Sequence, residues 1–265
     1  MRILVSNDDG IMAPGIRALA ETLAVAHDVY VVAPDRERSA TGHALTLHKP
    51  LRVETVDFYK GVKAAWALNG TPSDCIKLAT GALLDAPPDI VVSGINRGPN
   101  LGIDVIYSGT VSAAVEGMLM GYPSIAVSLA AFDDLHYATA ADAIALMVGD
   151  VAAYPFPPRT LLNVNVPSLP SAEIAGTVLT KLGVRKYHDR FETRVDLRGR
   201  TYYWLAGEIV DVVEDPAADV MAIRNHQISI TPVHYDLTCY PLLRDMEAWG
   251  QSLAAKLGHP RTKES

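Results

Sequence analysis

Two adjacent acidic residues, Asp8 and Asp9, follow the first apolar run of the chain at residues 3–5. This run is short and rich in β-branched side chains, which is typical of a buried strand in a parallel sheet. In open sheets of this kind, ligands bind beyond the carboxyl ends of the strands. Two neighbouring carboxylates repel each other, and one takes a proton unless a cation lies between them. Because hard divalent cations prefer oxygen ligands, the pair predicts a metal site; the alternative is a turn that caps the next helix.

Two further polar segments follow apolar runs. Residues 34–39 end in Ser39, whose hydroxyl is an acceptable ligand for a hard cation, and the alternative is a solvated charged loop. The glycine-rich residues 93–102 contain Asn96, which offers a carbonyl oxygen to a metal or an amide to a phosphate. A plain connecting turn is the alternative there, but so many glycines and asparagines in one loop favour binding.

A third segment, Ser108-Gly109-Thr110, opens a helical pattern at residues 110–120. The N-terminus of a helix offers unpaired amides and the positive end of the helix dipole. Hydroxyl donors and a glycine at such a position predict a phosphate-binding site. An ordinary Ser/Thr cap is the alternative, and the three other polar segments together favour phosphate binding.

Short apolar runs alternate with helical patterns over residues 1–170. This alternation predicts an α/β fold, with a Rossmann-like, doubly wound and mostly parallel sheet covered by helices on both faces. The predicted strands lie at residues 3–5, 29–32, 90–92, 125–127 and 161–166, and residues 43–56 are also predicted to be extended. The predicted helices lie at residues 14–23, 71–84, 110–120 and 134–148.

The pattern changes after residue 170. Residues 194–204 predict a β-hairpin around a glycine turn, residues 228–231 a final strand and residues 244–257 a helix. We expect the hairpin and the helix to pack on another subunit, and a flap over the site is the alternative for the hairpin. The tail at residues 258–265 is expected to be mobile.

The composition excludes several classes of protein. The formal net charge is −7 and no basic block is present, so a nucleic-acid duplex is not an expected partner. Cys75 and Cys239 lack Cys-x-x-Cys spacing, so a thiolate metal site is not expected. We expect two buried free thiols, and a disulfide is the alternative. The chain shows no apolar signal core at its start, and an apolar stretch at residues 138–156 is interrupted by Asp142 and Asp150. We therefore expect a cytoplasmic protein with no membrane partner.

Five segments in this order and spacing resemble the SurE (stationary-phase survival protein E) family of phosphatases. The segments are Asn7-Asp8-Asp9-Gly10, Pro34-Asp35-Arg36-Glu37-Arg38-Ser39, Asn69-Gly70-Thr71-Pro72-Ser73-Asp74, Ser93-Gly94-Ile95-Asn96 and Tyr107-Ser108-Gly109-Thr110. The resemblance covers residues 1–167, with a weaker similarity at residues 229–232. Two departures are Ser6, where a threonine is common, and residues 40–43, where many relatives carry smaller polar residues. The second departure bears on substrate preference.

The resemblance implies a metal-dependent nucleoside monophosphate phosphatase with a Rossmann-like core. The family's metal ligands match Asp8, Asp9, Ser39 and Asn96. The resemblance also implies homodimers or homotetramers that form through exchanged C-terminal elements. We therefore expect one domain over residues 1–265. Its catalytic core would span residues 1–170, and residues 171–265 would supply the oligomerisation hairpin, the final strand and the C-terminal helix.

Our hypothesis is that one divalent ion per subunit, Mg²⁺ or Mn²⁺, activates a water that attacks the phosphorus of nucleoside 5′-monophosphates in line. Asp8 or Asp9 would take the proton from that water. The phosphate oxygens would be held by Asn96, Ser108, Gly109 and Thr110. Nucleoside 3′-monophosphates and short polyphosphate are further candidate substrates.

Three other functions are weighed against this hypothesis. A covalent aspartyl-phosphate route of the haloacid-dehalogenase type needs Asp-x-Asp after the first strand, and here the aspartates are adjacent. A Rossmann dehydrogenase needs Gly-x-Gly-x-x-Gly at the same place, which this chain lacks. A non-catalytic nucleotide-binding regulator would keep the phosphate loop and need no metal, so metal-dependent phosphate release separates it from an enzyme.

Overall fold

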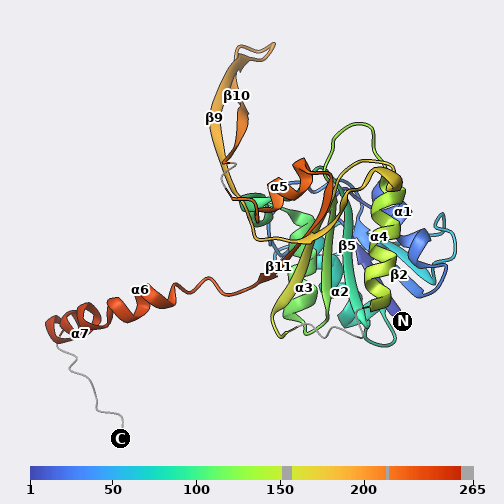
Figure 1. The fold of residues 1–265 in the computed structure, drawn as a ribbon, viewed down its shortest axis with the longest axis horizontal. Coiled ribbons are helices and arrows are strands. Elements are labelled where there is room, and N and C mark those ends of the chain that lie inside the picture. The colour runs from blue at the N-terminus through green and yellow to red at the C-terminus, as the bar shows by residue number, and fades with distance from the viewer. Residues whose placement is uncertain (151–156, 213–214, 258–265) are drawn as a thin grey trace, which may run out of the picture. The chain divides into compact units, whose positions relative to one another are not determined.

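The computed structural model describes residues 1–150, 157–212 and 215–257 (Figure 1). The chain divides into two compact units, Met1–His234 and a C-terminal unit that begins at Tyr235. The tail predicted at residues 258–265 lies outside the described residues.

A mostly parallel sheet forms the centre of the first unit. Among the described residues, nine strands join it in the order β3-β4-β2-β1-β5-β6-β7-β11-β8. The β3–β4 and β7–β11 pairs are antiparallel, and the other pairs are parallel. The strands are β1 (Arg2–Ser6), β2 (Asp28–Pro34), β3 (Val53–Val56), β4 (Ala64–Leu68), β5 (Ile90–Arg97), β6 (Ser124–Leu129), β7 (Thr160–Val166), β8 (Gly176–Leu179) and β11 (Gln227–His234). The predicted α/β class with a mostly parallel sheet is confirmed.

Helices cover both faces of this sheet, as the alternation of side chains along β1 requires. Ile3 and Val5 pack in one core with helices α1 (Pro14–Leu23) and α4 (Tyr137–Asp150). Leu4 points the other way and packs in a second core with α2 (Pro72–Leu78) and α3 (Gly109–Leu119). The central strands are buried on both faces, so they contain apolar runs rather than alternating polar residues.

Several predicted elements differ in detail from the structure. The predicted helix at residues 71–84 is α2, capped by Thr71, followed by a π-helical turn at Ala79–Leu83. Within residues 43–56, predicted to be extended, only β3 pairs as a strand of the sheet. β5 runs on to Arg97, past the predicted end at residue 92, with a register shift between Ser93 and Asn96.

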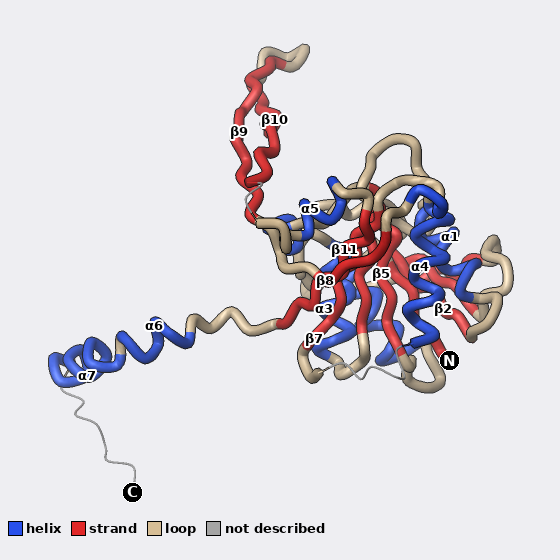
Figure 2. The backbone as a smooth tube through the Cα atoms, viewed as in Figure 1, coloured by secondary structure: helices blue, strands red, loops and turns tan. Residues whose placement is uncertain are grey.

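The predicted hairpin is present and is longer than the sequence indicated. Strands β9 (Val184–Val195) and β10 (Thr201–Val212) form a two-stranded antiparallel sheet (Figure 2). The turn between them is closed by Asp196, whose carboxylate accepts hydrogen bonds from the amides of Arg198 and Arg200. Gly199 in this turn has φ 75°, a conformation that glycine adopts at no steric cost.

The C-terminal unit contains two helices where the sequence predicted one. Helices α6 (Tyr240–Asp245) and α7 (Glu247–Lys256) are separated by Met246, whose φ and ψ of −87° and 1° interrupt the helix. No residue of α6 or α7 is buried. Cys239 is exposed and Cys75 is buried, so the prediction of two buried thiols was wrong for Cys239, which directly precedes α6 in this unit.

Three short helical segments complete the first unit. Helix α5 (Asp219–Arg224) packs beside β11, and short 3-10 helices lie at Gly102–Ile106 and Ser171–Glu173. Among the described residues, no helix is both long enough and apolar enough to cross a membrane.

Candidate active site

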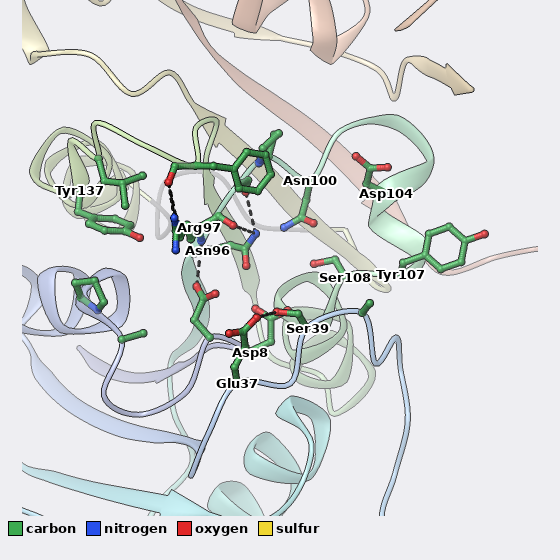
Figure 3. A pocket seen from close by; sticks show the side chains of 18 of the residues that line it. Asp8, Glu37, Ser39, Asn96, Arg97, Asn100, Asp104, Tyr107, Ser108 and Tyr137 are labelled. Atoms are coloured by element: carbon green, nitrogen blue, oxygen red, sulfur yellow. Dashed lines mark hydrogen bonds between the residues drawn. The ribbon is translucent and has the colours of Figure 1, made fainter. Parts of the chain in front are cut away.

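A cavity of about 800 Å³ opens at the carboxyl ends of β1 and β5. Five of the predicted site residues line it, namely Asp8, Asp9, Ser39, Asn96 and Ser108. Figure 3 shows Asp8, Ser39, Asn96 and Ser108 grouped in the middle of the cavity, with Tyr137 on one side and Asp104 and Tyr107 on the other. The sheet therefore brings together side chains that are up to about a hundred residues apart in sequence, as the strand order predicts.

Asp8 is buried and is held by the first turn of α3. Its side chain is only 4% exposed, and the hydroxyl of Thr110 donates to its Oδ1 at 2.5 Å. Burial raises the pKa of Asp8, while the Thr110 hydroxyl and the backbone amides of Thr110 and Gly109 favour the ionised form. A Cβ atom at Gly109 would lie 2.7 Å from the Cβ of Asp8, so glycine allows the helix to approach the carboxylate.

Gly109 and Thr110 therefore lie behind Asp8 and not on the cavity wall. The N-terminus of α3 contacts the Asp8 carboxylate, and the positive end of the helix dipole favours a negative charge at this place. Ser108 is the residue of this segment that reaches the cavity, and its Oγ accepts a hydrogen bond from the amide of Val111 as the helix cap. The hydroxyl hydrogen of Ser108 is not used by that bond.

Asp9 is less buried and lies in a more negative environment. The backbone amide of Arg97 donates to its Oδ2 at 3.0 Å. Burial, followed by repulsion from Asp8, raises the pKa of Asp9 to about 7, and Glu37 adds to the effect. Without a cation, Asp9 is thus half-protonated near neutral pH.

Asn96 is turned toward the aspartates by the irregular end of β5. The register of β5 against β6 shifts between Ser93 and Asn96, which re-aims the side chains that follow. The Nδ2 of Asn96 donates to the carbonyl of Gly98 at 2.8 Å, and its Oδ1 lies 3.4 Å from the Thr110 hydroxyl that binds Asp8. The amide therefore presents its oxygen to this end of the cavity.

Ser39 comes from the segment after β2, which is fastened to the first loop. The amide of Arg38 donates to the carbonyl of Asp8 at 2.7 Å. The Ser39 hydroxyl donates to the carboxylate of Glu37 at 2.7 Å, and both residues line the cavity. Glu37 lies within the motif at residues 34–39, but sequence reasoning assigned it no role.

These donors fit a hard divalent cation. Two carboxylates, an amide oxygen and a hydroxyl oxygen share one end of the cavity, and burial and repulsion from Asp8 raise the pKa of Asp9. A bound cation would offset this repulsion. Among the described residues, no group of three or more His, Cys, Asp or Glu side chains is placed to hold a metal ion. A site here would therefore depend on the neutral oxygens of Ser39 and Asn96 as well as on the aspartates.

Buried asparagines fix the loop between Asn96 and Ser108. Asn163 and Asn165 of β7 donate to the carbonyl of Asn100 at 2.8 and 3.0 Å, and Asn165 accepts from its amide at 2.8 Å. The Asn100 side chain donates to Ser128 at 2.7 Å. This network holds a long glycine-rich loop in one conformation, which is what a binding loop needs.

The root of the hairpin also joins the cavity wall. Arg185 and Tyr187 of β9 line the cavity, and both bind the carboxylate of Asp104. Buried Asp219 accepts hydrogen bonds from the amides of Gly102 and Gly183, each at 2.8 Å. No sequence motif marks these residues, because they come from segments without a recognisable pattern.

The comparisons with known proteins match these features. A family model described as "Survival protein SurE" matches residues 3–189. The chain belongs to the SurE family. The predicted family is thus confirmed, and the match reaches beyond the expected end at residue 167.

SurE relatives match the chain over most of its length. A "5'-nucleotidase SurE" from Thermosynechococcus vestitus is 57% identical over 256 residues, covering 94% of this chain and 96% of that protein. One from Gloeobacter violaceus is 59% identical over 244 residues, covering 91% and 92%. The crystal structure of the SurE protein from Aquifex aeolicus superposes with a TM-score of 0.82 at 39% identity, covering 94% of this chain and all of that one.

Proposed function

We propose that this SurE chain is a metal-dependent phosphatase that hydrolyses nucleoside 5′-monophosphates to nucleosides and phosphate. Relatives that share more than half of their residues with it over nearly the full length are named 5′-nucleotidases. The observation that carries the proposal is the pair Asp8 and Asp9, which share one end of the cavity with the oxygens of Ser39 and Asn96. No other group of residues in the described cavity combines paired carboxylates with neutral oxygen donors.

Asp8, Asp9, Ser39 and Asn96 would hold one divalent ion per subunit, Mg²⁺ or Mn²⁺. When bound, such an ion neutralises the carboxylates, polarises a phosphoryl oxygen and lowers the pKa of the water that attacks phosphorus. Asp9, the less buried of the two aspartates, would accept the proton from that water. Asp8, held by the Thr110 hydroxyl, keeps a fixed position during the reaction.

The phosphate would lie against Asn96 and the segment Ser108-Gly109-Thr110. Ser108 can donate its hydroxyl hydrogen to a phosphate oxygen directly from the cavity wall. Gly109 and Thr110 act mainly through Asp8, which they contact. Most of the rate would come from positioning and charge stabilisation, as in other phosphoryl transfers.

We also propose that the enzyme works as a homodimer or homotetramer in the cytoplasm, as one domain with its catalytic core at residues 1–170. Residues 171–265 would supply the contacts between subunits. The β9–β10 hairpin and the helices α6 and α7 carry large exposed apolar side chains, which typically mark an interface. Among them are Phe191, Tyr203, Trp204, Leu205, Leu243 and Trp249.

A phosphate-release assay tests the proposal. Nucleoside 5′- and 3′-monophosphates and short polyphosphate are incubated with the purified chain in magnesium, in manganese and in excess chelator. We expect release from the 5′-monophosphates that stops with chelator. Binding of nucleotides without release under any metal would instead support a non-catalytic regulator.

A further inference from the structure

Phe132 is an exposed aromatic residue on the wall of the cavity. It lies in the segment between β6 and α4, at the carboxyl end of a central strand, and its side chain is 60% exposed. An aromatic ring at this level of exposure in a substrate cavity offers a large flat apolar face to a ligand.

The position of Phe132 is fixed from behind. Gly98 passes directly beneath the ring, and a Cβ atom at this position would lie only 2.4 Å from the ring carbon Cε1. The guanidinium of Arg97 donates to the carbonyl of Phe132 from Nε at 2.9 Å and from Nη2 at 2.7 Å. Two hydrogen bonds from one planar group converge on this carbonyl oxygen and hold the segment in a defined orientation.

The same short segment also holds the reacting end of the site. The backbone amide of Arg97 donates to Asp9, and the side chain of Asn96 donates to the carbonyl of Gly98. Residues 96–98 thus connect a proposed metal ligand, a catalytic aspartate and the Phe132 ring. The spacing between the phosphate end and the aromatic ring is therefore set by one rigid piece of backbone.

We propose that Phe132 is the platform on which the nucleobase of the substrate stacks, and that Arg97 is the residue that positions it. This inference rests on the proposed nucleotidase function and names the subsite for the part of the substrate that does not react. Bases stack on aromatic rings with little regard to their identity, because every base has a π-face. The platform therefore selects nucleotides over sugar phosphates without strong preference among the bases.

The opposite wall of the cavity carries the competing aromatic residues, Tyr107 and Tyr187. The hydroxyl of Tyr187 binds Asp104, which also binds Arg185, so this wall is built around an ion pair. Tyr107 is 58% exposed, similar to Phe132, and serves as the matched control.

The test compares kcat/KM for a nucleoside 5′-monophosphate with kcat/KM for ribose 5-phosphate, which lacks the base. In Phe132→Ala we expect the ratio of the two values to fall roughly fivefold to a hundredfold, the usual effect of removing one stacking partner. Phe132→Trp should keep the ratio, because it keeps the aromatic face. Tyr107→Ala should leave the ratio at the wild-type value.

Arg97→Lys tests the positioning role. Lysine keeps the backbone amide that binds Asp9 but loses the paired donors to the Phe132 carbonyl. We expect a fall in the same ratio, mainly through KM for the nucleotide, and no further fall when Arg97→Lys is added to Phe132→Ala.

Three outcomes would overturn the inference. An equal loss for both substrates in Phe132→Ala would show that the ring does not contact the base. A fall of the ratio in Tyr107→Ala but not in Phe132→Ala would place the base on the opposite wall. Failure of the wild-type chain to hydrolyse either substrate would overturn the proposed phosphatase function itself. This result is distinguishable from failure of the stacking inference alone, in which the wild-type chain stays active.

Discussion

The two aspartates of the cavity differ in what surrounds them. Asp8 is almost inaccessible and receives a hydrogen bond from Thr110, whereas Asp9 faces the negative charges of Asp8 and Glu37. The difference separates their proposed roles: Asp8 is a fixed ligand and Asp9 exchanges protons.

Asp8→Asn should lower kcat by two or more orders of magnitude and leave the fold intact. Removal of one charge-stabilising group from an active site typically lowers kcat by roughly 10²–10³. The amide has nearly the same shape but removes the negative charge from the proposed metal site. Phosphate release measured with saturating metal checks this, and Asp142→Asn on α4, at an exposed position outside the cavity, is the control. Near-normal turnover by Asp8→Asn would remove Asp8 from the site.

At the scale of single elements, the N-terminus of α3 is shaped to fit Asp8. Gly109→Ala would place a methyl group within 2.8 Å of the Asp8 carboxylate oxygen, so the aspartate or the helix must move. Because misplacement by about 1 Å commonly costs on the order of a hundredfold in rate, we expect a loss of this size together with weaker metal binding.

Gly149→Ala in α4 is the control for Gly109→Ala, since no atom of the described residues lies within 4 Å of its Cβ position. It should leave phosphate release at the wild-type level, and the methyl group should stabilise the helix slightly. Equal activity of the two variants would show that the close approach of α3 to Asp8 is not needed.

A network around the buried carboxylate of Glu116 joins α3 to α2 and to the loop that follows Ser39. Glu116 of α3 lies 2.8 Å from His43 and 2.5 Å from Lys77 of α2, and its side chain is 3% exposed. The hydrogen bond from His43 is the main cause that lowers the pKa of Glu116; burial opposes it and Lys77 adds to it. The network fastens the segment that follows Ser39 to both helices.

This network predicts a pH-dependent stability. A lowered pKa in the folded state stabilises the fold above the ordinary value of 4.5, and this stabilisation is lost as the pH falls through the lowered pKa. Glu116→Gln should therefore reduce the free energy of unfolding at pH 7 by roughly 1–3 kcal/mol, and the difference from wild type should shrink below about pH 4.5.

Urea unfolding at a series of pH values measures this difference. Glu173→Gln, at an exposed position, serves as the control and should show no such pH dependence relative to wild type. A difference for Glu116→Gln that stays constant from pH 7 to pH 3 would contradict the assigned role of the carboxylate.

At the scale of the whole molecule, the sequence predicts the strands and the polar residues at their ends, because local residue patterns determine them. Apolar runs ending in Asp8, Ser39 and Asn96 indicated the strands and the polar residues at their ends, because strand ends in a parallel sheet meet at one edge. Phe132 and Arg185 could not be predicted as cavity residues. Their place depends on tertiary packing, since Phe132 is held by Arg97 and Arg185 by Asp104.

The same limit applies to the details of the elements. The orientation of the Asn96 side chain depends on the register shift in β5, and no residue type in the sequence predicts such a shift. The break at Met246 also leaves no signature in the helical spacing of residues 244–257. Conversely, Gly199 and the residues around it predicted the hairpin turn correctly, because the turn conformation is a local property of glycine.

The exposed C-terminal unit predicts a change in assembly on truncation. A chain ending at His234 loses α6 and α7, whose apolar side chains Leu242, Leu243, Trp249 and Leu253 are exposed. We expect sedimentation to show a smaller oligomer than the dimer or tetramer proposed for the full chain. A chain ending at Leu257 keeps both helices and is the control; a full chain that sediments as a monomer would contradict the proposal.

A metal titration tests the central claim most directly. The chain is stripped with chelator, dialysed and titrated with Mn²⁺, while bound metal is measured by calorimetry and phosphate release from a nucleoside 5′-monophosphate is measured in parallel. We predict one ion per chain, activity that rises in proportion to occupancy, and neither binding nor activity in Asp8→Asn. Full turnover by the stripped chain, or unchanged metal binding by Asp8→Asn, would contradict the account.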